Sequence, residues 1–239
     1  MDLNLKEIFV SYQAEGFYIG EPTIFIRFFG CNLDCYYCDE KLSKLNTNRK
    51  VDIRKVLIDI KKLLKEKNIK FISLTGGEPL IQPNIGLLVE QLYKLKKKFK
   101  FKLYLETNAS VANSLLKIIK YIDVISMDLK IPDDDKRNKN VLQEFKKCID
   151  ICKKSKKKFF VKLVVGGSSI YSLKTVKLIK SIIKKTNLSE IVLQPVTEEL
   201  RKKNKSLFLN LCNLFASLKN ILKNIYIIPQ LHKTIWKIK

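Results

Sequence analysis

Three cysteines, Cys31, Cys35 and Cys38, lie close together in the stretch RFFGCNLDCYYCDE. Three thiolates on one short loop can hold three corners of a metal cluster, and the missing fourth ligand leaves one metal open to a ligand from outside the protein. Catalytic metal sites keep an open position in the same way. A structural zinc site would need a fourth Cys or His, and the single histidine, His232, is distant in the sequence. The spacing predicts a catalytic cluster, with zinc binding and an accidental grouping as the alternatives.

Arg27 interrupts the otherwise apolar stretch TIFIRFF, just before this cysteine loop. A guanidinium in such a place needs an anionic partner, because burying an unpaired charge is costly. Two kinds of partner fit, an Asp or Glu of the protein in a buried ion pair, or the carboxylate of a substrate held by two parallel hydrogen bonds. The residues alone leave this choice open.

The other three cysteines have a different setting. Cys148 and Cys152 are four residues apart in EFKKCIDICKK and would share one helical face, where a free cysteine packs as a small apolar residue. Cys212 lies in the apolar stretch FLNLCNLF. We expect all three to be core residues.

The elements that must position these residues alternate between two hydrophobic periods. Helical spacing is clearest over 51–67, where Ile53, Val56 and Ile60 recur on one face. Strands alternating with helices predict βαβ crossovers and a parallel sheet covered by helices. The predicted strands are 23–29, 70–76, 101–107, 123–129, 159–165, 190–196 and 224–230. The predicted helices are 51–67, 84–98, 109–121, 139–156, 170–187 and 199–221.

Polar and glycine-rich motifs follow the predicted strands at their C-terminal ends. They are the cysteine loop and the segments TGGEP, ETN, DLK, VVGG, QPV and PQLH. In a full or partial barrel of parallel strands, chemistry collects at this edge. The sequence therefore predicts an α/β fold whose site lies along one rim of the sheet.

The chain has 239 residues and a formal net charge of +24. Five of its 47 basic residues are arginines, although recognition of phosphates and base edges favours arginine. We therefore interpret the lysines as a solvated surface, and nucleic acid is not an expected partner. No stretch is apolar enough to span a bilayer, and no basic region followed by an apolar stretch marks a secretory signal. We expect a single cytoplasmic domain with no membrane partner.

CNLDCYYC followed by TGGEP (75–79) resembles the radical S-adenosylmethionine (SAM) superfamily. The resemblance implies that the three cysteines bind a [4Fe-4S] cluster whose open iron is chelated by the methionine end of SAM. It also implies that TGGEP contacts the methionine amino group. Gly76 and Gly77 allow a close approach of the backbone, and Glu78 or nearby carbonyls can accept from an ammonium group. The implied fold is a partial (βα) barrel of the radical SAM type, as one radical SAM domain over residues 1–239.

The N-terminal part narrows the resemblance. Residues 7–39, EIFVSYQAEGFYIGEPTIFIRFFGCNLDCYYCD, are similar to the opening of 7-carboxy-7-deazaguanine synthases, and GGEPLIQ, ETNA, FVKLVV, LQPV and IIPQLHK continue the similarity. The resemblance implies a ring-contracting, ammonia-eliminating lyase of queuosine and 7-deazapurine biosynthesis. Its substrate would be 6-carboxy-5,6,7,8-tetrahydropterin and its product 7-carboxy-7-deazaguanine. An external one-electron donor such as flavodoxin and a homodimeric state are implied as well.

The same resemblance assigns roles to individual residues. Arg27 would hold the pterin carboxylate, and Gln13 and Glu15 would face N–H groups of the heterocycle. The other implied substrate contacts are Tyr12, Ala14, Thr75, Gln230 and His232. The implied SAM contacts are Tyr37, Asp39, Gly76, Gly77, Glu78, Pro79, Glu106, Asn108, Asp128, Lys130 and Gln194.

Two residues depart from the family's pattern. Ala14 replaces a glycine, so a left-handed backbone at this position would be strained. Glu40 replaces a hydroxyl residue that in many members helps to hold Mg²⁺ beside the substrate. A carboxylate is a better ligand for a hard cation than a hydroxyl. The sequence leaves open whether Glu40 binds Mg²⁺ or points away.

Two other functions stay open from the sequence. A glycyl-radical activating enzyme would share the cysteine spacing and the GGEP-like element, but it lacks the Q-x-E-G opening and the terminal P-Q-x-H-K. A basic RNA-binding module with a structural cluster would use the positive charge of the chain.

Overall fold

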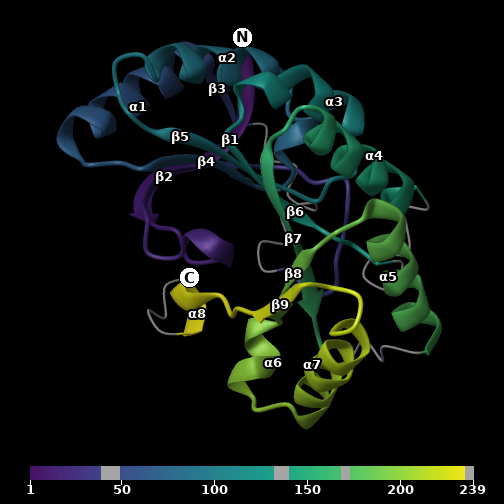
Figure 1. Ribbon diagram of the computed structural model, residues 1–239. Coiled ribbons are helices and arrows are strands. Elements are labelled where there is room, and N and C mark those ends of the chain that lie inside the picture. The colour runs from purple at the N-terminus through teal and green to yellow at the C-terminus, as the bar shows by residue number, and fades with distance from the viewer. Residues whose placement is uncertain (39–48, 132–139, 168–172, 235–239) are drawn as a thin grey trace.

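The computed structural model describes residues 1–38, 49–131, 140–167 and 173–234. Within these ranges nine strands form one sheet, in the order β3-β1-β2-β4-β5-β6-β7-β8-β9 (Figure 1). The strand β1 pairs antiparallel with β2 and β3, and every neighbouring pair from β2 to β9 is parallel. The strands are β1 (Asp2–Tyr12), β2 (Pro22–Phe28), β3 (Lys50–Asp52), β4 (Phe71–Gly76), β5 (Lys102–Thr107), β6 (Val124–Asp128), β7 (Lys158–Val165), β8 (Glu190–Pro195) and β9 (Asn224–Ile227).

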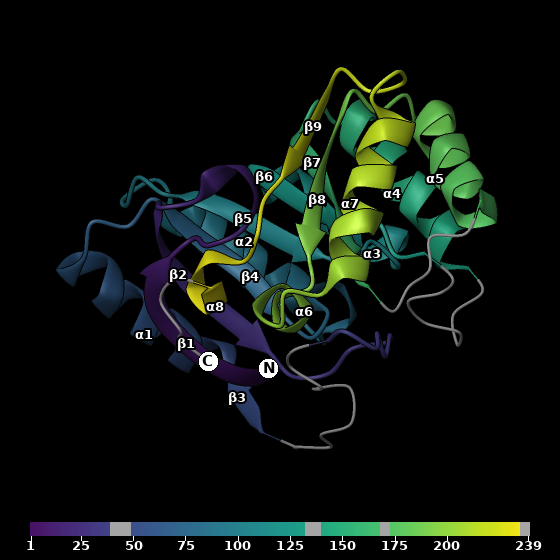
Figure 2. The same ribbon diagram turned by 90° about the horizontal axis from the view of Figure 1, so that it is seen from below.

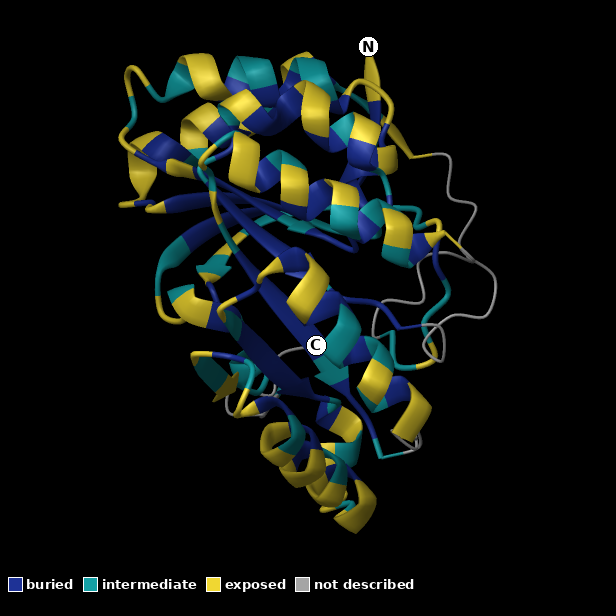
Figure 3. Ribbon diagram, turned by 45° about the vertical axis from the view of Figure 1, so that its right-hand side comes forward, coloured by how far each residue is buried: buried dark blue, intermediate teal, exposed yellow. Residues whose placement is uncertain are grey.

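The longer helices cover one face of the sheet, with their buried sides toward the strands and their exposed sides outward (Figure 3). They are α1 (Ile53–Glu66), α2 (Ile85–Leu95), α3 (Ala112–Ile118), α4 (Val141–Lys154), α5 (Leu173–Thr186) and α7 (Lys205–Leu218). The short elements are α6 (Thr197–Arg201), α8 (Leu231–Thr234) and the 3-10 turns η1 (Gly16–Tyr18), η3 (Pro79–Ile81) and η4 (Ile119–Tyr121). No helix among the described residues has the length and apolarity that crossing a membrane requires.

Helix α1 shows how the sequence produces this layer. The Asp52 carboxylate caps its first turn by accepting from the Arg54 backbone N–H at 2.8 Å. Ile53, Val56 and Ile60 are buried on one face of the helix. Burying one such aliphatic side chain contributes about 1.5–3 kcal/mol, so the apolar stripe outweighs the cost of ordering the helix only when the sheet covers it.

The strands alternate between the helix-covered face and an inner face. On the inner face, Phe71, Tyr104, Val124, Phe160 and Val192 form a separate apolar cluster. Tyr18 of η1 packs against this cluster at a ring distance of 5.0 Å from Phe71. Two residues further along the strands, the same face carries polar side chains: Ser73, Glu106, Ser126, Lys162 and Gln194. The inner face is therefore apolar at its base and polar toward the C-terminal strand ends.

All seven predicted strands are present, and the predicted parallel sheet is confirmed. Strands β1 and β3 were not predicted. The register of β1 shifts between Leu5 and Glu7, and such a bulge interrupts the alternation that marks a strand in a sequence. The predicted helix 199–221 is two helices, because Lys203 takes a left-handed conformation (φ 52°) between α6 and α7.

The expectations for the isolated cysteines are met in part. Cys148 and Cys152 are buried in α4, as predicted. Cys212 is exposed, so its assignment to the core is wrong. The buried stripe of α7 consists of Leu207, Leu211, Leu214 and Leu218, and residue 212 falls beside that stripe.

The C-terminal segment returns to the N-terminal part of the chain. The Leu231 backbone N–H donates to the Ala14 carbonyl oxygen at 3.0 Å. This contact brings α8 beside the loop that follows β1 (Figure 2). The sheet itself is open within the described residues, with β3 and β9 as its edges, so the expected partial barrel is confirmed.

Candidate active site

A cleft of about 440 Å³ opens at the C-terminal ends of the parallel strands. Its volume suits a small-molecule site. The predicted site residues that line it are Tyr12, Gln13, Ala14, Glu15, Arg27, Cys31, Cys35, Tyr37, Cys38, Thr75, Gly76, Gly77, Glu106, Asn108, Asp128, Lys130, Gln194, Gln230 and His232. Glu78 and Pro79 are not part of this lining, and Asp39 and Glu40 lie outside the described residues.

The cysteine loop follows β2 directly and presents all three sulfur-bearing side chains to the cleft. The Sγ of Cys31 accepts from the Leu33 backbone N–H at 3.4 Å and from the Asn108 side-chain amide at 3.7 Å. Burial raises the pKa of the Cys31 thiol to about 11. Iron binding would therefore have to displace the proton, as in other thiolate sites.

The three cysteines suit a cluster better than a single metal ion. Among the described residues, no three His, Cys, Asp or Glu side chains converge on one ion position. A [4Fe-4S] cluster needs no such convergence, because each thiolate binds a different iron. N–H groups directed at a cysteine sulfur, as at Cys31, are a further feature of cluster ligands. The donor set therefore fits the cluster that the sequence predicts.

The TGGEP turn contacts the start of the cysteine loop. Gly76 has a φ of +106°, and the backbone N–H groups of Gly77 and Glu78 donate to the carbonyls of Phe28 and Gly30 at 3.0 and 2.8 Å. A Cβ on Gly77 would lie 1.7 Å from the Gly30 carbonyl oxygen. The two glycines are therefore required where two protein segments meet, next to Cys31.

The Glu78 carboxylate is buried and satisfied within the protein. It accepts from the backbone N–H groups of Leu80 (2.9 Å) and Asn108 (2.8 Å) and from the Thr107 hydroxyl (2.7 Å). Burial raises the pKa of Glu78 to about 7 against the effect of these hydrogen bonds. Because both oxygens are used in this way, the side chain of Glu78 holds the end of β5 against the TGGEP turn.

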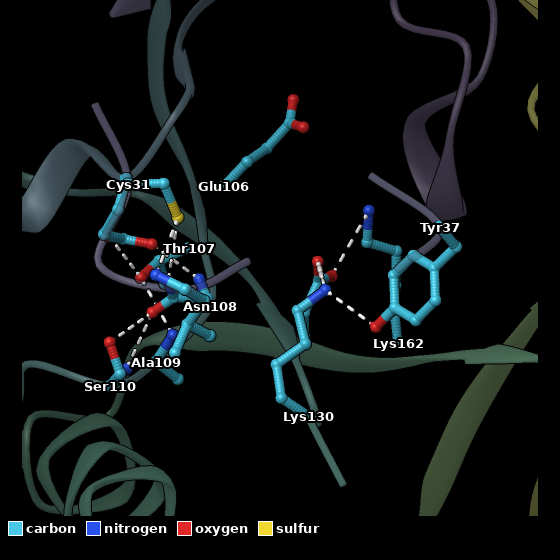
Figure 4. Close-up of polar contacts among 12 residues, drawn as sticks. Cys31, Tyr37, Glu106, Thr107, Asn108, Ala109, Ser110, Lys130 and Lys162 are labelled. Atoms are coloured by element: carbon cyan, nitrogen blue, oxygen red, sulfur yellow. Dashed lines mark hydrogen bonds and ion pairs between the residues drawn. The ribbon is translucent and has the colours of Figure 1, made fainter. Parts of the chain in front are cut away.

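Asn108 links the end of β5 to the cysteine loop. Its amide donates to Asn32 Oδ1 at 3.1 Å and to Cys31 Sγ, and its own Oδ1 accepts from the Ser110 backbone N–H at 3.0 Å (Figure 4). Ser110 in turn accepts from the Asn32 amide at 2.8 Å. Asn108 thus orients the first cysteine of the loop.

Arg27 has one of the two partners that the sequence left open, an acidic residue of the protein. Its Nη1 lies 2.8 Å from Glu7 Oε1, and its guanidinium lies 4.8 Å from the centre of the Phe9 ring. Glu7 and Arg27 face each other in the β1–β2 register. The arginine also lines the cleft. A guanidinium has five N–H donors, so an arginine at this position can bind more than one acceptor.

Glu106 and Gln13 form a hydrogen-bonded group in the floor of the cleft. Glu106 accepts from Ser73 (2.9 Å), Thr75 (3.2 Å) and the Gln13 amide (3.2 Å). Burial raises the pKa of Glu106, the positive charge of Lys162 opposes that effect, and the negative charge of Glu15 adds to it.

The backbone of Ala14 is not among the described residues with positive φ, so the strain considered for this position does not arise.

A chain of charged groups crosses the cleft from Glu15 to Tyr37. Lys162 Nζ lies 2.6 Å from Glu15 Oε2 and 3.4 Å from Asp128 Oδ1. Lys130 Nζ lies 3.0 Å from Asp128 Oδ2 and 3.2 Å from the Tyr37 hydroxyl (Figure 4). Burial alone would raise the pKa of Glu15, but the charge of Lys162 and hydrogen bonds from Lys162 and Gln230 lower it to about 2. Glu15 is therefore ionised at neutral pH.

Several residues that line the cleft were not predicted from the sequence. Among them are Glu7, Phe9 and Lys162. Lys162 carries the same sequence signal as Arg27, a cation within an apolar strand, and the stretch FFVKLVV could have revealed it.

Gln194 and Gln230 complete the cleft beside β8 and α8. Gln230 donates to Glu15 Oε1 at 2.8 Å and accepts from the Thr197 hydroxyl. The Oε1 of Gln194 is buried and has no hydrogen-bond partner among the described residues. An unsatisfied buried acceptor costs free energy, so this amide suits a polar ligand such as SAM in the cleft.

The sequence model of the radical SAM superfamily matches residues 25–203. That range contains the cysteine loop, the TGGEP turn and strands β4 to β8. The chain therefore belongs to the radical SAM superfamily, whose members use a [4Fe-4S] cluster and SAM. Within it, the chain belongs to the 7-carboxy-7-deazaguanine synthase family, because it is 34% identical over 242 residues to the synthase of Clostridium acetobutylicum. That alignment covers 99% of this chain and 97% of the relative.

Other relatives agree with this assignment. The 7-carboxy-7-deazaguanine synthase of Methanopyrus kandleri is 39% identical over 149 residues, which are 54% of this chain and 58% of that protein. The synthase of Archaeoglobus fulgidus is 34% identical over 172 residues, covering 69% of this chain and 72% of that protein.

Solved structures share the fold. The crystal structure of QueE from Escherichia coli has a TM-score of 0.55 at 18% identity and covers 96% of this chain and 93% of that chain. A structure of anSMEcpe with bound AdoMet has a TM-score of 0.60 at 18% identity, covering 83% of this chain and 58% of that chain.

Proposed function

We propose that this chain converts 6-carboxy-5,6,7,8-tetrahydropterin to 7-carboxy-7-deazaguanine with loss of ammonia. The enzyme would be a ring-contracting lyase of queuosine and 7-deazapurine biosynthesis. The observation that carries the proposal is its family membership, which rests on an alignment over nearly the whole chain. The cleft adds support, because it contains both a cysteine loop and groups that suit a carboxylated heterocycle.

Cys31, Cys35 and Cys38 would hold the cluster, and the surrounding loops would hold SAM. When bound, the cluster and SAM would supply the radical chemistry that removes hydrogen from C6 of the pterin. The methionine end of SAM would meet backbone groups of the TGGEP turn, since the Glu78 carboxylate is engaged inside the protein. Asp128 and Lys130, beside Tyr37, would meet other polar groups of SAM.

The substrate would lie between Arg27 and Glu15. Arg27 would bind the pterin carboxylate while Glu7 and the ring of Phe9 hold the guanidinium in place. Glu15 would accept hydrogen bonds from the heterocycle as an anion, and Gln13 would add an amide. Tyr12, Ala14, Thr75, Gln230 and His232 would complete this side of the cleft.

Several finer features belong to the same proposal. Glu40 would bind Mg²⁺ beside the substrate, a flavodoxin-like protein would supply the electron, and two chains would form a homodimer. We propose further that residues 1–239 make one radical SAM domain and that the enzyme acts in the cytoplasm.

The proposal is tested by anaerobic reconstitution with iron and sulfide, followed by incubation with SAM, a reductant and the carboxytetrahydropterin. We expect both 5′-deoxyadenosine and 7-carboxy-7-deazaguanine. If 5′-deoxyadenosine forms without the deazaguanine, the chain is a radical SAM enzyme with another substrate. Salt-dependent RNA binding together with indifference to SAM would favour the RNA-binding alternative, and capture of a glycyl-radical enzyme would favour the activating-enzyme alternative.

A further inference from the structure

Lys162 lines the cleft and is 5% exposed. Its Nζ is 2.6 Å from Glu15 Oε2, which belongs to the loop after β1, and 3.4 Å from Asp128 Oδ1 at the end of β6. The β6–β7 register pairs Asp128 with Lys162, so the sheet itself sets the second contact. The first contact joins residues 147 positions apart in the sequence.

The surroundings of Lys162 differ on its two sides. On the Asp128 side, Lys130 supplies a second cation at 3.0 Å. On the Glu15 side, Gln230 donates at 2.8 Å, His232 of α8 contributes a coulombic attraction, and Glu106 of β5 adds a like charge. Removal of Lys162 would therefore leave Asp128 with Lys130, while Glu15 would lose the cation that most favours its ionised form.

We propose that Lys162 is a positioning residue that joins the two halves of the site, by holding the substrate-side carboxylate of Glu15 in a fixed place relative to the SAM-side carboxylate of Asp128. The assignment of these sides rests on the proposed function. A buried cation shared by two anions fixes both of them, because movement of either one would leave a charge unpaired in a medium that solvates it poorly. Lys162 would thus set the distance between the two ligands.

A purely structural role for Lys162 makes different predictions. Buried ion pairs often contribute little net stability, and a core ion pair would change unfolding without changing ligand recognition. A positioning role predicts that substrate affinity depends on the ionisation of Glu15 once Lys162 is gone. Without the lysine, burial dominates and the pKa of Glu15 rises. Protonation then removes an acceptor for the heterocycle as pH falls.

The experiment compares cluster-reconstituted wild type with Lys162→Met, Lys130→Met and the double variant Glu15→Gln/Lys162→Met. Anaerobic calorimetric titrations with SAM and with the carboxytetrahydropterin, from about pH 6 to pH 8, give affinities relative to wild type at each pH. We expect Lys162→Met to weaken the binding of both SAM and the pterin by about tenfold or more. The pterin affinity of Lys162→Met, relative to wild type, should fall further as pH is lowered. Its thermal unfolding temperature, relative to wild type, should rise over the same change in pH.

Lys130→Met is the matched control, because Lys130 is equally buried and contacts Asp128 as well. This control variant should bind SAM more weakly, and its pterin affinity relative to wild type should not depend on pH. In the double variant the pH dependence of stability that Lys162→Met adds relative to wild type should disappear, because Glu15 is the group whose pKa the lysine lowers. If Lys162→Met does not fold, recovery of folding in the double variant supports the link to Glu15, and failure of both contradicts it.

Unchanged affinities in folded Lys162→Met would overturn the proposal. So would a pH dependence in the double variant that exceeds that of wild type as much as it does in Lys162→Met. The SAM affinity and the pH dependence of unfolding need no turnover. A wild-type protein that binds SAM but not the pterin would therefore contradict the proposed function, while these two readouts would still decide the role of Lys162.

Discussion

Gly77 lies directly against the carbonyl oxygen of Gly30, and a Cβ on Gly77 would stand 1.7 Å from that oxygen. The same two segments are joined by the hydrogen bond from the Glu78 N–H to the Gly30 carbonyl at 2.8 Å. The second glycine of TGGEP therefore positions the residue that precedes Cys31. In this protein a motif expected to serve a ligand also determines where the cysteine loop begins.

We expect Gly77→Ala to displace the cysteine loop, because the added methyl group can be accommodated only if backbone moves. The measurement is the iron and sulfide content after reconstitution, together with the visible absorption of the cluster. Gly86→Ala is the control, since a Cβ at Gly86 in α2 would meet nothing within 4 Å. The control should be neutral or stabilising by up to about 1 kcal/mol. Full cluster content in Gly77→Ala would contradict the positional role.

The raised pKa of Glu78 predicts that the stability of the folded protein depends on pH. Burial raises its pKa in the folded protein to about 7, above the value near 4.3 expected for an unfolded chain. Protonated Glu78 therefore stabilises the fold fully below about pH 4, and this stabilisation is lost as pH rises through about 7. The size of this effect is about 3–4 kcal/mol.

The comparison that isolates this effect is wild type against Glu78→Gln by denaturant unfolding from about pH 5 to pH 8. Glutamine has one acceptor oxygen where the carboxylate has two, so the variant should be less stable by about 1–3 kcal/mol. The stability advantage of wild type should shrink as pH rises. A constant difference across this range would show that Glu78 does not titrate there.

Arg27→Met should abolish turnover and weaken pterin binding by about a hundredfold, because a charge-assisted bidentate contact is lost. The cluster absorption should not change, since the Arg27 guanidinium is paired with Glu7 and lies over the ring of Phe9. Arg54→Met is the control, because the side chain of Arg54 is 89% exposed and pairs with Asp52. Unchanged pterin affinity in Arg27→Met would remove this residue from the substrate site.

The role proposed for Glu40 predicts a dependence on Mg²⁺. Activity of the wild type should fall when Mg²⁺ is removed with a chelator and return when Mg²⁺ is restored, and Glu40→Thr should need a higher concentration because a hydroxyl is a weaker ligand. The measurement is the initial rate over a Mg²⁺ titration. Equal titration curves for the two proteins would mean that Glu40 is not a ligand.

The sequence predicted the part of the site that is local in the chain. The cysteine loop, TGGEP and Arg27 stand in short motifs whose chemistry can be read from spacing and from the ends of apolar strands. The ion pair between Arg27 and Glu7 could not be predicted, because it depends on the β1–β2 register and a bulge obscures β1 in the sequence. Cys212 was misplaced because apolar neighbours do not show which side of a helix a residue faces.

Glu78 and Lys162 show the limits of motif reading in opposite directions. The motif suggested a ligand contact for Glu78, yet its carboxylate accepts hydrogen bonds from Leu80, Thr107 and Asn108. Lys162 stands in FFVKLVV, a stretch that does not show its partners, and the inner face of the sheet brings it between Glu15 and Asp128. Both outcomes depend on contacts between strands that are distant in the sequence.

The central claim is that this cleft carries out radical chemistry at C6 of the carboxylated pterin. The most direct test is anaerobic turnover with substrate deuterated at C6, followed by mass spectrometry of 5′-deoxyadenosine and recovered SAM. The account predicts deuterium in these molecules together with 7-carboxy-7-deazaguanine. Formation of 5′-deoxyadenosine without deuterium and without the deazaguanine product would contradict it.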